Sequence, residues 1–476
     1  MNRTKIVCTL GPACDDDDKI RAMIRAGMNV ARINFSHGDH AAHLTRIERV
    51  RRIAQEMKAI IAVLGDLQGP KLRVGEIANG FVMTYADREI ILTTREVPGD
   101  EHEVYLPHPD LVHDVKPGQR LLLDDGQLEF IVLGTTDTDI RCKVVNGGPL
   151  SSHKGVSAPG ANLSLSALSD KDREDAVFGA EQQLDFLALS FVRTAEDVKK
   201  LRALLDAMGS KIPIVTKIEK AEALENFSEI LSCSDVIMVA RGDLGVETPA
   251  ESVPVVQKEL IRHCNARGVP VITATQMLNS MITQPRPTRA EASDVANAIY
   301  DGTDALMLSA ETASGKYPVE SVEMMSKIAH ITEQDVPFEK WSDRRVIGAA
   351  HSIADAIGHA TVEIAYELNA KAIVTSTLSG NTTRLLARFR PRAGIIAATP
   401  SEVVQRQLAL VWGVTPILSQ RYATTDDMIR VGVLLTVKNG LAQRGDTIII
   451  TAGIPATSSN HTNMLKVHVI GEGDGQ

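Results

Sequence analysis

The sequence has few cysteines and no pattern that would pair them or bind zinc. Its 476 residues include five cysteines, and none belongs to a C-x-x-C pair. They are scattered at Cys8, Cys14, Cys142, Cys233 and Cys264. An odd, dispersed set excludes a disulfide framework and a cysteine zinc site as organising features. We therefore expect free thiols and a reducing, cytoplasmic setting.

Long apolar runs and an excess of positive charge are also absent. No run approaches the roughly 18–20 residues that span a bilayer, and Met1–Lys5 leads into a strand-like run without the apolar core of a signal peptide. Lysine and arginine total 51 against 60 aspartate and glutamate residues, a net charge of −9. This balance argues against nucleic acid or a membrane surface as the main partner. The length predicts two to four globular domains.

Eight short apolar runs alternate with amphipathic helical stretches. The runs lie at 5–8, 28–33, 60–64, 186–190, 213–216, 236–240, 270–273 and 305–308. Most are rich in Val and Ile without alternation, which is typical of parallel strands buried on both faces. Eight such units in order predict a (β/α)8 barrel, formed by residues 1–69 and 156–335, whose catalytic groups gather at the carboxyl ends of the strands.

Two other segments depart from this rhythm. Residues 70–155 contain β-like runs at 89–93, 119–123, 128–133 and 139–145, separated by turn signals, which predict a small β domain inserted in a βα loop. A polar connector follows the barrel at 333–345. Residues 346–476 return to alternating helices and strands and predict an open α/β domain.

Three charged residues stand at neighbouring strand ends. Lys217 and Glu219 are two apart on the fifth run and therefore face the same side, and Asp243 follows the sixth run after Gly242. Two carboxylates suit Mg²⁺, and a lysine beside them suits charge developing on a phosphoryl or enolate oxygen. The alternative is a buried Lys–Glu ion pair that only closes the top of the barrel.

Other strand ends add groups that bind anions. Arg32 and Arg73 can grip phosphate with their planar guanidinium groups, or form surface ion pairs. Thr275 offers a hydroxyl at the mouth, or serves as a helix N-cap. Thr288 and Glu291 form a structural capping box. Together the strand ends predict a phosphorylated, anionic substrate.

The motifs NVARINFSHG, GDLQGPKLR, TKIEKAE, VARGDLGVE, ATQML and MLSAETA resemble those of the pyruvate kinase family in order and spacing. The resemblance covers essentially the whole chain. It implies a (β/α)8 barrel, a mobile β lid, a C-terminal regulatory domain and a homotetramer. The implied reaction is Mg²⁺- or Mn²⁺-dependent phosphoryl transfer from phosphoenolpyruvate to ADP, giving ATP and pyruvate.

The resemblance also implies a role for individual residues. Lys217 stabilises the transferring phosphoryl and the enolate, Glu219 and Asp243 hold the metal, and Arg32 contacts phosphate. The backbone at Gly242 contacts the substrate carboxylate, and Thr275 lies on the enolate face that is protonated. The implied nucleotide contacts are Asn34, Phe35, Ser36, His37, Arg73 and Lys154.

One departure concerns a monovalent cation. In family members that need K⁺, Glu stands at the position of Lys71 and Thr at that of Leu67. We expect the Lys71 ammonium to replace K⁺, although Asn34, Ser36 and Asp66 remain as a vestigial cation site.

The second departure concerns regulation. The C-terminal loop of Ser376, Thr377, Ser379, Gly380, Asn381, Thr382 and Thr383 has hydroxyls and glycine before a helix, which favours a phosphorylated effector, or is a plain turn. The later stretch 453–459 lacks the aromatic and basic residues of members activated by fructose 1,6-bisphosphate. We therefore expect a sugar monophosphate or AMP as activator.

Two other functions would use part of the same pattern. A Mg²⁺-dependent barrel lyase or aldolase acting on pyruvate-like enolates would share the lysine and carboxylates, but it would not need a lid. A non-catalytic sensor of phosphorylated metabolites would be expected to have lost Lys217, Glu219 or Asp243, and all three are present.

Overall fold

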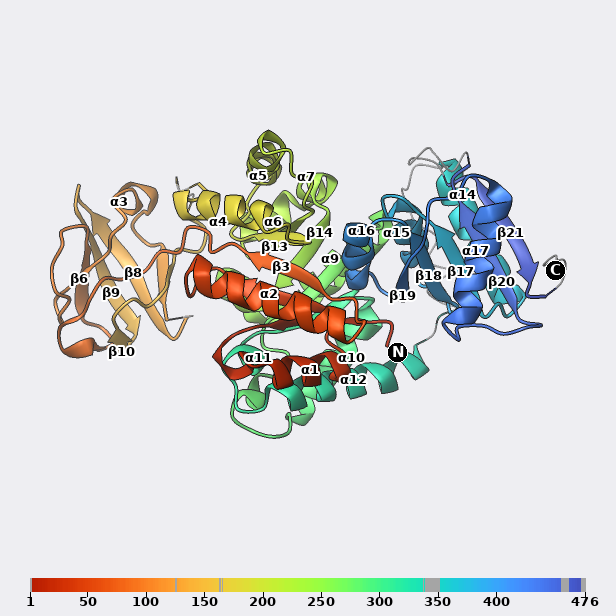
Figure 1. Ribbon diagram of the computed structural model, residues 1–476. Helices are drawn as coiled ribbons and strands as arrows, with labels where there is room; N and C mark the ends of the chain where they lie inside the picture. The colour runs from red at the N-terminus through yellow and green to blue at the C-terminus, as the bar shows by residue number, and fades with distance from the viewer. Residues whose placement is uncertain are drawn as a thin grey trace.

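The computed structural model describes residues 2–124, 126–161, 164, 166–336, 338, 352–454 and 462–471. Figure 1 shows three parts in a row, with the inserted β domain at one end, the barrel in the middle and the C-terminal domain at the other end. No helix in these ranges is long and apolar enough to cross a membrane.

The central part is a closed barrel of eight parallel strands. Its strands are β1 (Lys5–Thr9), β2 (Val30–Asn34), β3 (Ala62–Asp66), β12 (Phe186–Leu189), β13 (Ile214–Ile218), β14 (Val236–Ala240), β15 (Val271–Ala274) and β16 (Ala305–Leu308). They neighbour one another in chain order, and β16 closes the ring on β1. The predicted (β/α)8 barrel is confirmed, with each of the eight apolar runs on a strand.

Helices surround the barrel, and an apolar layer lies between them and the strands. These helices are α1 (Asp17–Ala26), α2 (His40–Glu56), α4 (Asp170–Glu181), α5 (Ala195–Ala207), α6 (Ala221–Glu225), α7 (Phe227–Cys233), α8 (Arg241–Glu247), α9 (Val253–Arg267), α10 (Arg289–Asp301), α11 (Ala310–Ala313) and α12 (Pro318–Asp335). The capping box at Thr288 and Glu291 starts α10 as expected.

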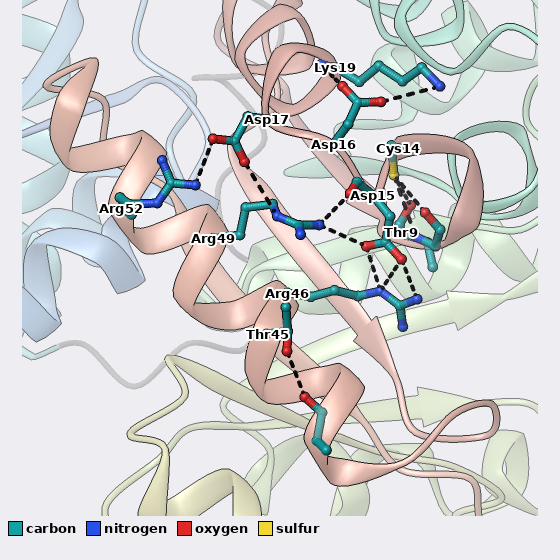
Figure 2. A network of polar contacts seen from close by, with 12 residues as sticks. Thr9, Cys14, Asp15, Asp16, Asp17, Lys19, Thr45, Arg46, Arg49 and Arg52 are labelled. Atoms are coloured by element: carbon teal, nitrogen blue, oxygen red, sulfur yellow. Dashed lines mark hydrogen bonds and ion pairs between the residues drawn. The ribbon is translucent and has the colours of Figure 1, made fainter.

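The acidic run before α1 also ties that helix to α2 (Figure 2). Asp16 caps α1 by accepting a hydrogen bond from the Lys19 amide. The Asp15 carboxylate accepts two hydrogen bonds from Arg46, at 2.9 Å from Nε and 2.6 Å from Nη2, and the Asp15 carbonyl accepts one from Arg49. The start of α1 is therefore fixed against the middle of α2, because a bidentate Arg–carboxylate pair sets orientation as well as distance.

The inserted domain is a small β structure with its own apolar core. It contains β4 (Phe81–Thr84), β5 (Glu89–Thr93), β6 (Glu103–Tyr105), α3 (Leu111–Asp114), β7 (Arg120–Leu123), β8 (Leu128–Thr135), β9 (Asp139–Asn146), β10 (Gly148–Ser151) and β11 (Val156–Ser157). Because β11 pairs with β7, the domain continues beyond residue 155, where the sequence placed its end.

The C-terminal domain is a five-stranded sheet with helices. Its elements are α14 (Ile353–Glu367), β17 (Ala372–Ser376), α15 (Asn381–Ala387), β18 (Gly394–Thr399), α16 (Glu402–Gln407), β19 (Val414–Leu418), α17 (Thr425–Lys438), β20 (Thr447–Ala452) and β21 (Met464–Val469). The order is β19-β18-β17-β20-β21, with only β21 antiparallel within this sheet. The predicted connector needs correction, because Glu333 lies in α12 and accepts hydrogen bonds from the Arg3 and Thr4 amides. Much of the rest of the connector, 339–345, falls outside the described residues.

Candidate active site

A cavity of about 90 Å³ opens at the carboxyl ends of the barrel strands. Its wall comes from five strands, β2, β3, β13, β14 and β16, and from segments that follow these strands and β12 and β15. The predicted site residues among its lining are Arg32, Asn34, Ser36, Asp66, Lys71, Lys217, Glu219, Asp243 and Thr275. The barrel thus brings together side chains that are up to 243 residues apart in the chain (Arg32 to Thr275).

Lys217 is the centre of a charged network in this cavity. Its Nζ lies 2.8 Å from Glu219 Oε1 and 3.5 Å from Asp66 Oδ1, and donates a hydrogen bond of 2.7 Å to Ser190 Oγ. Arg32 reaches the same carboxylate, with its Nε 2.7 Å from Asp66 Oδ2. The predicted common orientation of Lys217 and Glu219 is confirmed by their contact, and the pair borders a cavity.

Burial and charge act in opposite directions on this network. Burial works to lower the pKa of Lys217, but the carboxylates of Asp66, Glu219 and Asp243 together raise it. Burial raises the pKa of Glu219, against the lowering effect of Lys217, and the nearby charge of Asp243 raises it further. The pKa of Asp66 is lowered because Lys217 and Arg32 outweigh its burial. The lysine is therefore held as an ammonium ion.

Glu219 and Asp243 form a two-carboxylate pair that fits a hard divalent cation. Glu219 is 1% exposed, and its Oε2 accepts a hydrogen bond from the Phe191 amide. Asp243 lies in the first turn of α8 and lines the same cavity. The described residues contain no group of three His, Cys, Asp or Glu arranged around one metal position. Two protein carboxylates suit Mg²⁺, which keeps its other positions for water and substrate oxygens.

Thr275 is held in an unusual backbone conformation. Its φ is +70°, a region that β-branched residues rarely occupy. Its Oγ1 accepts a hydrogen bond of 2.7 Å from the Gly242 amide, and Arg241 Nη2 donates to its carbonyl oxygen. No helix begins at Thr275, so the alternative reading of this residue as an N-cap is wrong. Backbone strain held this firmly is typical of functional loops.

A second cavity of about 310 Å³ lies between the barrel mouth and the inserted domain. Its cationic side chains are Lys71, Arg73, Lys154, Arg193 and Lys220. Lys154 pairs with Asp124 at 2.6 Å, and Arg73 Nη1 donates to the His153 carbonyl. Lys71, Phe191 and Asp243 line both cavities, so the two cavities adjoin at these residues.

The side chains of the predicted nucleotide loop, Asn34–His37, do not all lie in the same place: some line the smaller cavity and one is in the core. Asn34 and Ser36 line the smaller cavity, whereas the Phe35 ring is fully buried and packs edge-on against Phe178 and His43. Phe35 can therefore reach a ligand only through its main chain. Burial and the charges of Lys71, Arg73 and Arg32 lower the pKa of His37.

Sequence reasoning missed Ser190 and Phe191, which follow β12. Ser190 receives the Lys217 hydrogen bond, and Phe191 lines both cavities. The available signal was the polar residue Ser190 at the carboxyl end of the fourth apolar run.

The three threonines of the C-terminal loop, Thr377, Thr382 and Thr383, are buried, and each hydroxyl has a hydrogen-bond partner. Gly380, with a φ of +84°, donates its amide hydrogen to Thr377 Oγ1. Thr383 Oγ1 lies 2.8 Å from Thr375 Oγ1, and Thr382 Oγ1 lies 2.9 Å from Thr462 Oγ1. The loop lies between a strand and a helix, as the sequence predicts, but Ser376 belongs to β17, and Asn381, Thr382 and Thr383 form the first turn of α15. In the later stretch 453–459, residues from 455 onward lie outside the described ranges.

Comparisons with known proteins agree along the chain. Residues 1–322 match the barrel domain of pyruvate kinase and residues 355–468 match its alpha/beta domain. Pyruvate kinases of Staphylococcus aureus strains USA300 and NCTC 8325 / PS 47 are 45% identical over 474 residues, which cover 99% of this chain and 81% of theirs. A crystal structure of a pyruvate kinase from Cryptosporidium parvum superposes with a TM-score of 0.94 at 36% identity, covering 98% of this chain and 96% of that one. The chain belongs to the pyruvate kinase family and is a phosphotransferase.

Proposed function

We propose that the chain transfers the phosphoryl group of phosphoenolpyruvate to ADP, with the smaller cavity holding phosphoenolpyruvate and the larger one ADP. The observation that carries this proposal is the shared boundary at Lys71, Phe191 and Asp243. Phosphoryl transfer requires donor and acceptor oxygens to meet in line at one point. A lyase or aldolase would have no use for the second, cationic cavity.

In this proposal the smaller cavity binds and stabilises the anionic substrate. Arg32 and Lys217 contact the phosphoryl group, and Lys217 also stabilises the enolate oxygen that is left when the P–O bond breaks. Glu219 and Asp243 hold Mg²⁺ or Mn²⁺, which supplies Lewis-acid neutralisation of phosphoryl oxygens when bound. Gly242 orients the substrate carboxylate, and Thr275 positions the proton donor above the enolate.

The larger cavity orients the nucleotide in the same proposal. Arg73 and Lys154 bind the ADP phosphates from the inserted domain. Asn34 and Ser36 reach the same phosphates from the smaller cavity, across the shared boundary, with His37 next to them in the loop. The amide and carbonyl of Phe35 are already hydrogen-bonded, so Phe35 holds the loop in place. The lid excludes water when closed, so the phosphoryl group passes to ADP instead of being hydrolysed. We further propose a cytoplasmic homotetramer, as the resemblance implies.

The deciding experiment follows pyruvate formation from phosphoenolpyruvate with Mg²⁺, in the presence and in the absence of ADP. Pyruvate that appears only with ADP, together with equimolar ATP, supports the proposal. Pyruvate without ADP supports a lyase or a phosphatase. No pyruvate from folded protein, with candidate activators present, supports the sensor alternative.

We also propose that activity does not need K⁺. Lys71 lines the same cavity as Asn34, Ser36 and Asp66, which supports the proposal that its ammonium group replaces a monovalent cation. Replacing tetramethylammonium with K⁺ at equal ionic strength is expected to change the rate less than about twofold, since a fixed charge already supplies the attraction. The variant Lys71→Glu is expected to lose activity without K⁺ and regain part of it with K⁺. Strong stimulation of the wild type by K⁺ would contradict this.

A phosphorylated activator is proposed for the loop between β17 and α15. Glucose 6-phosphate, ribose 5-phosphate or AMP is expected to lower the half-saturating phosphoenolpyruvate concentration more than fructose 1,6-bisphosphate does. Ser379→Asp is expected to abolish this response, because a carboxylate in the loop repels phosphate. Ser401→Asp is the matched control, since Ser401 caps α16 in the same domain and aspartate is an equally good cap. A response to the bisphosphate alone would sink the proposal.

A further inference from the structure

One face of α4 lies against the loop that carries the proposed nucleotide contacts. Lys171, Asp175 and Phe178 are spaced i, i+4 and i+7, so they share one side of the helix. All three contact Phe35 or His40, which lie more than 130 positions earlier in the chain.

The main chain of Phe35 is fixed from two sides. Its amide donates a 3.0 Å hydrogen bond to the Asp66 carbonyl on the barrel. Its carbonyl oxygen accepts a 2.8 Å hydrogen bond from Lys171 Nζ. Because the peptide units on both sides of Phe35 are held, its neighbours Asn34 and Ser36 present their side chains in fixed directions.

The end of the loop is fixed by the same helix face. Asp175 is buried, and its two oxygens lie 2.6 Å from Lys171 Nζ and 2.7 Å from His40 Nε2. The His40 ring stacks on Phe178 with centroids 4.3 Å apart and planes 9° from parallel. His40 is the first residue of α2, and α2 is fixed further along by Arg46 (Figure 2).

His43, on the core side of the loop, does not provide this support. Its ring packs on Phe35, and neither ring nitrogen has a hydrogen-bond partner among the described residues. Burial, with the charge of Arg46, lowers the pKa of His43 to about 4, so the ring is neutral near pH 7. The polar contacts that hold the Phe35 main chain from outside the loop are therefore those of Asp66 and Lys171.

The first turn of α4 also holds a connection to the inserted domain. Asp172, adjacent to Lys171, is fully buried and accepts hydrogen bonds from the Gly69 amide and from Ser169. Gly69 has a φ of +69°, and a Cβ there would lie 2.6 Å from the Phe191 ring. Two consecutive residues of α4 thus hold two different segments. Lys171 holds the nucleotide loop, and Asp172 holds the segment at Gly69 that leads into the inserted domain.

We propose that Lys171 is a positioning residue for nucleotide binding, acting through the Phe35 carbonyl oxygen while Asp175 and Phe178 hold the end of the loop. This inference rests on the proposed ADP site. Lys171 does not line either cavity, so it acts on the nucleotide only through the loop.

The test separates the two substrates in steady-state kinetics. Lys171→Met is expected to raise the KM for ADP on the order of tenfold and to leave kcat and the KM for phosphoenolpyruvate within about twofold. Lys171→Arg, which can still donate to the carbonyl, is expected to recover most of the ADP affinity. The Lys171 side chain is 47% exposed, so the variant is expected to fold.

Lys327→Met is the matched control, because Lys327 is also an exposed helical lysine paired four residues away, with Glu323. An ADP KM in Lys171→Met equal to that of the control, or an equal rise in both KM values, would overturn the proposal. If the wild type forms no pyruvate, the proposed function fails independently. Titration calorimetry with MgADP then still tests the loop, with weaker binding by Lys171→Met expected and equal binding overturning it.

Discussion

Replacing Lys217 with methionine is expected to lower kcat by on the order of a thousandfold or more. We propose that its ammonium group contacts the transferring phosphoryl, where one cation carries a large share of transition-state stabilisation. Lys217 is 12% exposed and is the ammonium group that contacts both Glu219 and Asp66. Because its pKa is raised, the wild-type lysine stays charged throughout the neutral range. Steady-state assays with saturating Mg²⁺ measure the loss.

Lys5→Met is the control for this variant. Lys5 is also a buried lysine on a barrel strand, but it starts β1 at the opposite end, where its Nζ donates to the Val414 carbonyl. Burial there lowers the pKa of Lys5 to about 8. Its loss is expected to change stability and leave kcat within about fivefold, because it lies far from the cavities. A Lys217→Met enzyme with a tenth or more of the wild-type kcat would contradict the assigned role.

The barrel could be predicted because parallel strands that are buried on both faces appear in the sequence as continuous runs of apolar residues. Each of its eight runs is a strand, with ends displaced by at most two residues. Individual elements of the C-terminal domain are less clear from the sequence. Pro416 interrupts the apolar pattern of β19, and proline is tolerated there because β19 is an edge strand.

The charged centre was predicted in part for a similar reason. The two-residue spacing of Lys217 and Glu219 fixes their common side, whatever the rest of the fold does. The hydrogen bond from Lys217 to Ser190 joins residues 27 positions apart. The hydrogen bond from Lys171 to Phe35 joins residues 136 positions apart. Local spacing carries no record of such contacts, because they depend on how the barrel closes and on where α4 packs.

Arg390→Met is expected to give the largest loss of stability of any single substitution considered, about 3–5 kcal/mol, because it leaves a buried carboxylate unpaired. Arg390 Nη1 and Nη2 lie 2.8 and 2.9 Å from the two oxygens of Asp304, and both side chains are 4% exposed. The guanidinium also lies over the Trp412 ring, 5.0 Å from its centroid. This pair joins the C-terminal domain to the barrel, and calorimetric unfolding measures its loss.

Two further variants distinguish the loss of the buried Arg390–Asp304 pair from the general effect of removing an arginine. Arg430→Met removes a 2.7 Å ion pair with Asp427 in the same domain, but Arg430 is 72% exposed, so a change below about 1 kcal/mol is expected. The double variant Asp304→Asn/Arg390→Met is expected to be more stable than Arg390→Met, because the cost comes mainly from the uncompensated charge. Asp304 precedes β16, at the end of the barrel opposite the mouth, so kcat of folded Arg390→Met is expected to remain near that of the wild type. Equal destabilisation by Arg390→Met and Arg430→Met would show that the buried pair does not join the two domains energetically.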